Sequence, residues 1–182
     1  MELPELIQDG VPEIAFVGRS NSGKSSLLNA MCSRKSLARV SKTPGRTQAI
    51  NLFAMDIPLR FADLPGYGYA KVAASVRKHW RQMLGDYLLT RDCLAAIVVV
   101  HDSRRKISEE ERWFFDHCEA PAILALSKTD KLKKSELSSV VKKIVTELGV
   151  DKSQVVPVSV LKANDPGLQT ILESIVDSLE FE

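Results

Sequence analysis

Residues 18–25 of this 182-residue chain have the types and spacing needed to hold phosphate groups. They read Gly-Arg-Ser-Asn-Ser-Gly-Lys-Ser and match the pattern G-x-x-x-x-G-K-[ST]. Glycines let the backbone curl so that successive N–H groups point at one anion. Lys24 would neutralise the β- and γ-phosphates of a nucleotide, and the Ser25 hydroxyl would bind Mg²⁺. The predicted nucleotide-binding residues of this loop are Gly18, Arg19, Ser20, Asn21, Ser22, Gly23, Lys24, Ser25 and Ser26.

A second candidate motif follows an apolar run and reads Asp63-Leu64-Pro65-Gly66. A carboxylate at the end of a strand beside a phosphate loop can hold Mg²⁺ through water, and the Gly66 N–H can contact a γ-phosphate and report its loss. This short pattern also fits an ordinary turn, but its place 45 residues after Gly18 favours a nucleotide site. We predict that Asp63, Leu64, Pro65 and Gly66 bind nucleotide and that Asp63 is also a Mg²⁺ ligand.

Two further segments have the chemistry needed to recognise guanine. In Ser127-Lys128-Thr129-Asp130, the carboxylate can accept hydrogen bonds from the guanine N1–H and the exocyclic amine. Adenine offers no such pair of donors, so it would leave the carboxylate unpaired. Around Ser159, a backbone N–H can meet guanine O6, although these residues alone also fit a solvated loop. The predicted base-binding residues are Ser127, Lys128, Thr129, Asp130, Val158, Ser159 and Val160.

Short apolar segments alternate with amphipathic ones, and together they would position these motifs. Strands are predicted at 13–18, 48–57, 59–64, 95–100, 122–126 and 155–159, with the second and third forming a hairpin. Helices are predicted at 24–32 and 75–89. Another would begin at a capping box formed by Ser108 and Glu111, and a further one carries an apolar stripe that ends at Gly149. The last helix would begin at Asp165-Pro166. The last helix would face inward through Leu168, Ile171, Leu172, Ile175, Val176 and Leu179. This alternation indicates a three-layer α/β fold around a mostly parallel six-stranded sheet with one antiparallel edge strand and helices on both faces.

Composition and charge limit the class of protein. Hydrophobic residues make up 45% and charged residues 26%, values typical of a soluble globular protein, so we expect one domain over residues 1–182. The longest apolar run, Cys93 to Val100, has 8 residues, too few for a membrane helix. The three cysteines lack metal spacing, and no secretory signal is recognisable, so we expect a cytoplasmic protein without a membrane partner. The net charge of +2 hides acid-free basic stretches at 14–55 and 64–85, which favour a polyanionic partner.

The motifs together resemble one family of GTPases. Residues 12–26, 44–48 and 63–71 read PEIAFVGRSNSGKSS, PGRTQ and DLPGYGYAK, and they are similar to the EngB (YihA/YsxC) proteins, Ras-like P-loop GTPases of the translation-factor superclass. The resemblance spans nearly the whole chain. It implies a bacterial cytoplasmic protein that binds GTP and GDP, uses Mg²⁺, acts as a switch in assembly of the large ribosomal subunit, and is needed for cell division and septation.

The resemblance also implies roles for particular residues. Gly45, Arg46 and Thr47 would form part of the first switch and bind nucleotide, with Thr47 a Mg²⁺ ligand and Thr43 the competing candidate. Asn21 matches an asparagine that coordinates K⁺ in related GTPases. Tyr67 occupies the position of the glutamine that orients water in Ras-like proteins, so intrinsic hydrolysis is expected to be slow and stimulated by a partner, K⁺ or both. No catalytic residue is identified.

The chain departs from the family pattern at two positions. Ser127 stands where the family usually has Thr or Asn, and Val160 stands where a second Ser or Ala is usual. Ser127 keeps a hydroxyl but loses packing, which would weaken binding of the base. At Val160 the backbone contact to guanine remains available.

The partner of the basic stretches has two interpretations. Two groups of cations are involved: those between Arg34 and Arg46, and Lys71, Arg77, Lys78 and Arg81. They would either lie on solvated faces or contact ribosomal RNA phosphates when GTP orders the switches. No DNA partner is expected. Two other classes of function remain: a nucleoside kinase on the same loop, which offers no reason for the 127–130 motif, and a GTP-binding interaction module without a ribosomal role.

Overall fold

The computed structural model describes residues 9–32, 50–68, 74–161 and 164–179, with residues 74–81 described by their backbone alone. Its centre is a six-stranded sheet in the order β2-β3-β1-β4-β5-β6. The strands are β1 (Glu13–Gly18), β2 (Asn51–Ala54), β3 (Arg60–Asp63), β4 (Leu94–Asp102), β5 (Ala122–Ser127) and β6 (Val155–Pro157). All neighbouring pairs are parallel except β2 with β3, so the predicted fold class is confirmed.

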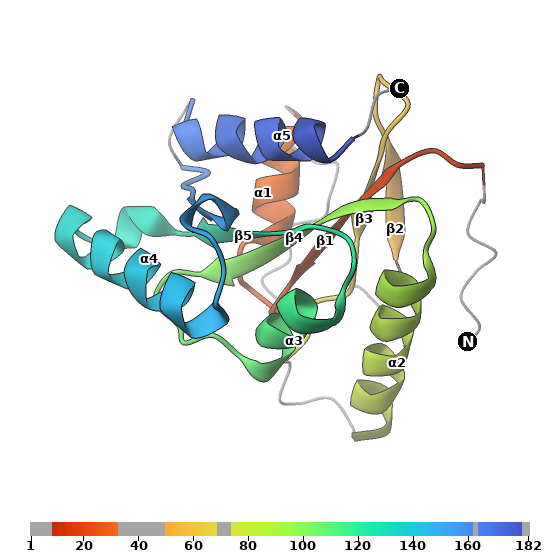
Figure 1. Cartoon of the computed structure of the whole chain (residues 1–182), viewed down its shortest axis with the longest axis horizontal. Helices are drawn as coiled ribbons and strands as arrows, with labels where there is room; N and C mark the ends of the chain where they lie inside the picture. The colour runs from red at the N-terminus through yellow and green to blue at the C-terminus, as the bar shows by residue number, and fades with distance from the viewer. Residues whose placement is uncertain (1–8, 33–49, 69–73, 162–163, 180–182) are drawn as a thin grey trace.

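Helices cover both faces of this sheet (Figure 1). One face carries α1 (Lys24–Met31) and α5 (Pro166–Ser178), and the other carries α2 (Ala74–Thr90), α3 (Glu109–His117) and α4 (Lys134–Leu148). Along β1, Ile14 and Phe16 pack toward α1 and α5, whereas Ala15 and Val17 pack toward the other three helices. Because each strand is buried on both sides, its sequence is continuously apolar rather than alternating.

Local sequence signals explain where several helices begin and end. Ser108 caps α3 by accepting a hydrogen bond from the Glu111 N–H, while the Glu111 carboxylate accepts one from the Ser108 N–H. Asp165 caps α5 ahead of Pro166, and Gly149 ends α4 in a left-handed conformation with φ of +67°. These predicted boundaries are confirmed because each depends only on neighbouring residues.

Two predicted strands were too long, and one side chain predicted to face inward is exposed. The predicted strand 48–57 is formed only over Asn51–Ala54, its first two residues lying outside the described chain, because residues 55–59 make the hairpin turn that lets Ala54 pair with Arg60. β6 stops at Pro157 rather than residue 159. Val176 is 51% exposed, since α5 contacts the sheet mainly through Ile171 and Ile175.

Across the described ranges, no helix is both long and apolar enough to cross a membrane.

Candidate functional site

The predicted phosphate loop connects the end of β1 to the start of α1. Gly18 has no room for a side chain, because a Cβ there would lie 2.7 Å from both the Val100 carbonyl oxygen and Ser22 Oγ. Asn21 and Gly23 have φ angles of +65° and +102°, which curl the loop back toward the helix. Lys24 is the first residue of α1, so the loop surrounds the positive end of that helix. This geometry is a cradle for an anion.

Lys24 and Asp63 meet at the carboxyl ends of β1 and β3. The register pairs Phe16 with Asp63, and the Lys24 ammonium forms an ion pair with the Asp63 carboxylate. Both side chains are less than one tenth exposed. Burial lowers the pKa of Lys24, and the Asp63 carboxylate partly offsets that effect. The ion pair places a cation and a carboxylate together beside the phosphate loop.

Ser25 and Asp63 are the described residues with the chemistry to hold Mg²⁺. Hydroxyl and carboxylate oxygens are the hard ligands that this ion prefers, and one or two protein ligands suffice because Mg²⁺ keeps several waters. Among the described residues, no group of three or more His, Cys, Asp or Glu side chains forms a dedicated metal cage. The donor set present therefore fits Mg²⁺ held jointly with phosphates.

The Asp63–Gly66 motif packs directly against the phosphate loop. The Ser20 N–H donates to the Tyr67 carbonyl at 2.9 Å, and the Tyr67 N–H donates to the Gly18 carbonyl at 3.3 Å. A Cβ on Gly66 would lie 3.2–3.3 Å from atoms of Ser20, so glycine allows this close approach. Leu64 is fully buried and Pro65 is buried beside it. The backbone that leaves β3 is therefore in contact with the loop that would hold the phosphates.

Tyr67 points into the protein rather than toward solvent. Its ring packs against Phe114 of α3 at 5.6 Å, and only 5% of the residue is exposed. Its hydroxyl has no hydrogen-bond partner among the described residues, and burial together with the nearby carboxylates of Glu111 and Glu110 raises its pKa. In this arrangement the phenol belongs to the core under α3, and it is not placed to orient a water molecule.

The end of β5 is tied to the phosphate loop by side chains. Ser127 Oγ lies 2.5 Å from the Ser22 carbonyl oxygen and 2.9 Å from that of His101, and it donates to one of them. The Lys128 ammonium donates to the Asn21 carbonyl at 2.6 Å. The hydroxyl that Ser127 retains thus helps to hold the phosphate loop in place.

Asp130 and Ser159 meet across two separate loops. The Ser159 hydroxyl donates to Asp130 Oδ1 at 3.0 Å, and Lys131 lies 3.3 Å from the other carboxylate oxygen. Desolvation opposes ionisation of Asp130, but these two contacts outweigh it and lower the pKa of the carboxyl. Thr129 opens a short 3₁₀ helix at this point, while Val158 is buried and Val160 half-buried beside Ser159. The structure brings the two predicted base-binding segments together.

Asp102 is a residue of this site that the sequence reading missed. It ends β4, is 2% exposed, and accepts hydrogen bonds from the Lys128 ammonium at 2.9 Å and from the Arg104 guanidinium at 2.7 and 2.9 Å. Those contacts hold the pKa of Asp102 well below its usual range, although burial acts in the opposite direction. An acidic residue at the carboxyl end of an apolar strand was the available signal, since ligands bind at that edge of a parallel sheet.

Several predicted residues lie outside the described chain. They are Gly45, Arg46 and Thr47, the competing Thr43, the basic residues between Arg34 and Arg46, and Lys71. Of Arg77, Lys78 and Arg81, only the backbone is among the described residues.

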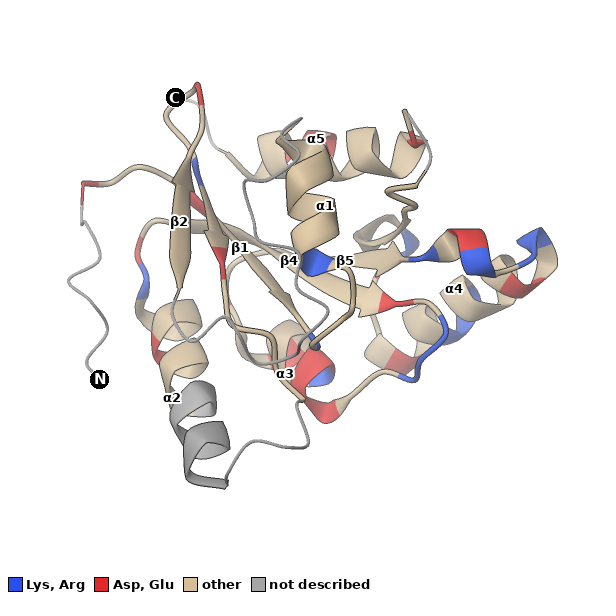
Figure 2. Ribbon diagram, turned by 180° about the vertical axis from the view of Figure 1, so that it is seen from behind, with Lys and Arg blue, Asp and Glu red and all other residues tan. Residues whose placement is uncertain are grey.

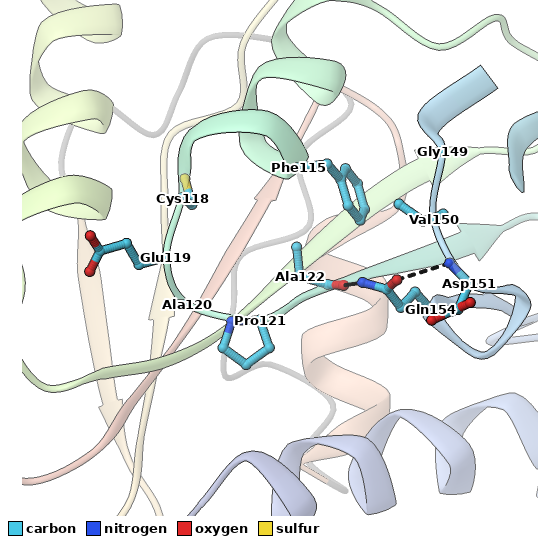
Figure 3. A pocket seen from close by; sticks show the side chains of 10 residues that line it. All are labelled: Phe115, Cys118, Glu119, Ala120, Pro121, Ala122, Gly149, Val150, Asp151 and Gln154. Atoms are coloured by element: carbon cyan, nitrogen blue, oxygen red, sulfur yellow. Dashed lines mark hydrogen bonds between the residues drawn. The ribbon is translucent and has the colours of Figure 1, made fainter. Parts of the chain in front are cut away.

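A separate hollow lies at the other end of the sheet. It has a volume of about 330 Å³ and is bordered by the end of α3, the start of β5 and the end of α4, with Phe115, Pro121 and Gln154 among its lining residues (Figure 3). No predicted site residue lines it. The candidate site is therefore the carboxyl edge of the sheet, where the phosphate loop, Asp63, Asp102, Asp130 and Ser159 gather.

Comparison with known proteins defines the class of this site. The family described as "50S ribosome-binding GTPase" matches residues 13–128. A probable GTP-binding protein EngB from Chlorobaculum parvum is 50% identical over 73% of this chain and 71% of its own length. One from Trichlorobacter lovleyi is 43% identical over 93% of this chain and 87% of its own. The protein is a P-loop GTPase. It belongs to the EngB family of GTP-binding proteins.

Solved structures show the same fold. A crystal structure of a probable GTP-binding protein EngB superposes with a TM-score of 0.75 at 22% identity, covering 91% of this chain and 97% of that one. Era in complex with MgGDPNP and part of 16S ribosomal RNA gives a TM-score of 0.75 at 22% identity, covering 94% of this chain and 57% of Era. NFeoB from S. thermophilus bound to GDP.AlF4⁻ and K⁺ gives a TM-score of 0.64 at 25% identity, covering 93% of this chain and 64% of NFeoB.

Proposed function

We propose that this protein hydrolyses GTP to GDP and phosphate and acts as a nucleotide-dependent switch in assembly of the large ribosomal subunit. It would act in the cytoplasm, and normal cell division and septation would depend on it. One observation carries the nucleotide half of this proposal. Ser127 and Lys128, next to Asp130 with its proposed contact to the base, reach the backbone carbonyls of Ser22 and Asn21 in the phosphate loop, at 2.5 and 2.6 Å. A guanine base and its phosphates would thus be held by one connected unit. The family description supports the ribosomal half.

The described residues divide the work of binding. Residues 18–26 would receive the phosphates, with Lys24 exchanging the Asp63 carboxylate for phosphate oxygens as its counter-charge. Asp130, held ionised by Ser159 and Lys131, would accept the two guanine donors. Bound Mg²⁺, held by Ser25 and Thr47 and through water by Asp63, would supply positive charge to the phosphates. Gly45, Arg46, Leu64, Pro65, Gly66, Val158 and Val160 complete the proposed site.

Hydrolysis would be slow in the isolated protein. The Tyr67 side chain carries a phenol rather than an amide, and it lies buried against Phe114. It therefore cannot orient an attacking water as the glutamine of Ras-like proteins does. The charge that an arginine finger supplies elsewhere would come from a partner, from K⁺ at Asn21, or from both. The NFeoB structure with bound K⁺ supports a cation site in this fold. Equal hydrolysis rates in K⁺ and Na⁺ would remove Asn21 from the proposal; a slower rate in Na⁺ is expected.

Co-sedimentation with purified ribosomal subunits tests the proposed function. The protein is mixed with small or large subunits in the presence of a non-hydrolysable GTP analogue, GDP or an ATP analogue. Binding to the large subunit with the GTP analogue alone is the expected result. Binding to neither subunit, with GTP affinity intact, would instead indicate an interaction module without a ribosomal role.

A further inference from the structure

Two exposed basic loops lie side by side next to the base-binding end of the site. The loop after β4 carries Arg104, Arg105 and Lys106, and the segment after β5 carries Lys131, Lys133 and Lys134; all six residues are exposed. Figure 2 shows these basic segments on the same side of the molecule, after β4 and around the start of α4. We call these six residues the β4–β5 cationic surface.

Hydrogen bonds and ion pairs hold the two loops together. The Ser103 N–H donates to the Ser127 carbonyl at 3.0 Å, and the Ser103 hydroxyl donates to the Lys128 carbonyl at 3.3 Å. Asp102 binds Arg104 from the first loop and Lys128 from the second. The spacing of the two rows of charge is therefore set by the protein, which reduces the entropy that a bound partner would otherwise have to overcome.

Most of this charge is free to bind a partner. Arg105, Lys106, Lys133 and Lys134 form no ion pair with any carboxylate of the described chain. The nearest acidic residues have local roles: Glu136 accepts a hydrogen bond from the Lys133 N–H, and Glu109 and Glu110 lie in the first turn of α3, where a helix favours negative charge. Arg104 remains half exposed beside Asp102.

The chemistry of the surface favours RNA phosphates over an acidic protein. Protein interfaces are depleted in lysine and are built around apolar or aromatic anchors. Among the described residues, the large hydrophobic side chains that are most exposed are Ile57, Leu89, Leu161 and Val176, and none lies in either loop. Adjacent cations in two rows match the repeated charge of a nucleic-acid backbone, and guanidinium groups bind phosphate oxygens in pairs.

We propose that the β4–β5 cationic surface binds the phosphate backbone of structured RNA, and that it is a contact of the large ribosomal subunit separate from the two switch segments. The assignment of this contact to the large ribosomal subunit rests on the proposed function. Because Asp102 and Lys128 join this surface to the phosphate loop, RNA binding and nucleotide binding would share one anchor. Each cation is expected to displace condensed counterions from one phosphate.

The test compares two double variants with a matched control. Arg105→Gln/Lys106→Gln and Lys133→Gln/Lys134→Gln each remove two charges from the surface, whereas Lys142→Gln/Lys143→Gln removes two exposed charges from later turns of α4. None of these side chains belongs to the nucleotide site. Binding to naked 23S rRNA and to purified large subunits is measured across salt concentrations, and GDP affinity confirms that each variant is folded.

Either surface variant should bind 23S rRNA about 10-fold more weakly at 0.1 M salt and reduce the slope of log K against log salt by about 1.5–2, with the control unchanged. The same losses on the large subunit would place the contact in the ribosome. Losses on rRNA alone, with no subunit binding by the native protein, would support the surface and contradict the proposed function. Unchanged rRNA binding by both surface variants, an equal loss in the control, or no rRNA binding by the native protein would overturn the proposal.

Discussion

Replacing Asp102 with asparagine should weaken nucleotide binding although Asp102 touches no predicted ligand. The carboxylate accepts hydrogen bonds from Lys128, which itself donates to the Asn21 carbonyl of the phosphate loop. An amide of the same shape keeps one oxygen but turns an N–H₂ group toward two cations. A buried hydrogen bond to a charged group contributes about 1.5–3 kcal/mol, and the lower end applies because the Lys128 side chain is 31% exposed.

A loss of about 1.4 kcal/mol corresponds to about 10-fold weaker binding of both GDP and GTP. The assay is titration calorimetry or a fluorescent-nucleotide titration, at a temperature where circular dichroism shows both proteins fully folded. The free energy of unfolding should also fall by about 2–3 kcal/mol, because the Lys128 and Arg104 cations lose their buried carboxylate partner.

Arg104→Gln is the matched control for this substitution. It removes the other cation that binds Asp102 but leaves the contact from Lys128 to Asn21 in place. Its effect on the free energy of unfolding should stay below about 1 kcal/mol, because the Arg104 side chain is half exposed. Native affinity in Asp102→Asn, or an equal loss of affinity in Arg104→Gln, would refute the positioning role of Asp102.

Three further predictions test other parts of the structure. Asp130→Asn should shift preference from GTP toward xanthosine triphosphate in a competition assay, since the amide can no longer accept both guanine donors; unchanged GTP affinity would contradict the base assignment. Tyr67→Phe removes a buried hydroxyl that has no hydrogen-bond partner among the described residues. The free energy of unfolding, measured by denaturant titration, should therefore stay equal or rise by about 1 kcal/mol. A clear decrease in the free energy of unfolding would reveal a partner for that hydroxyl. Glu13 is fully buried and accepts hydrogen bonds from Tyr87 and Arg91. Burial raises the pKa of its carboxyl, but these hydrogen bonds outweigh burial and hold the pKa below 4.5. The ionised Glu13 therefore stabilises the fold above pH 4.5, and this stabilisation is lost as the pH falls through the lowered pKa. Glu13→Gln should cost about 3–5 kcal/mol at pH 7 and flatten the acid side of the stability curve; an unchanged acid profile would show that Glu13 does not control it.

Much of the fold could be predicted because its signals are local. The capping box at Ser108 and Glu111, Pro166 at the start of α5 and Gly149 at the end of α4 act on residues within one turn. The continuous apolar runs at 13–18 and 122–126 predicted strands buried on both faces, and both are observed. The edge strand was overestimated, because hydrophobic pattern does not reveal where pairing gives way to a hairpin turn.

The sequence by itself determined which residue types stand at the ends of the central strands, and it predicts the class of chemistry from them: a glycine-lysine loop for phosphate, Asp63 for a metal and Asp130 for a base. Only the tertiary structure decided which of these groups hold one another in place. Asp102 reaches Lys128, Lys128 reaches Asn21, and Tyr67 turns under α3 because parallel strands distant in sequence bring their carboxyl ends to one edge. Sequence spacing carries no information about those distances, since hydrogen bonds between loops depend on the register of the whole sheet.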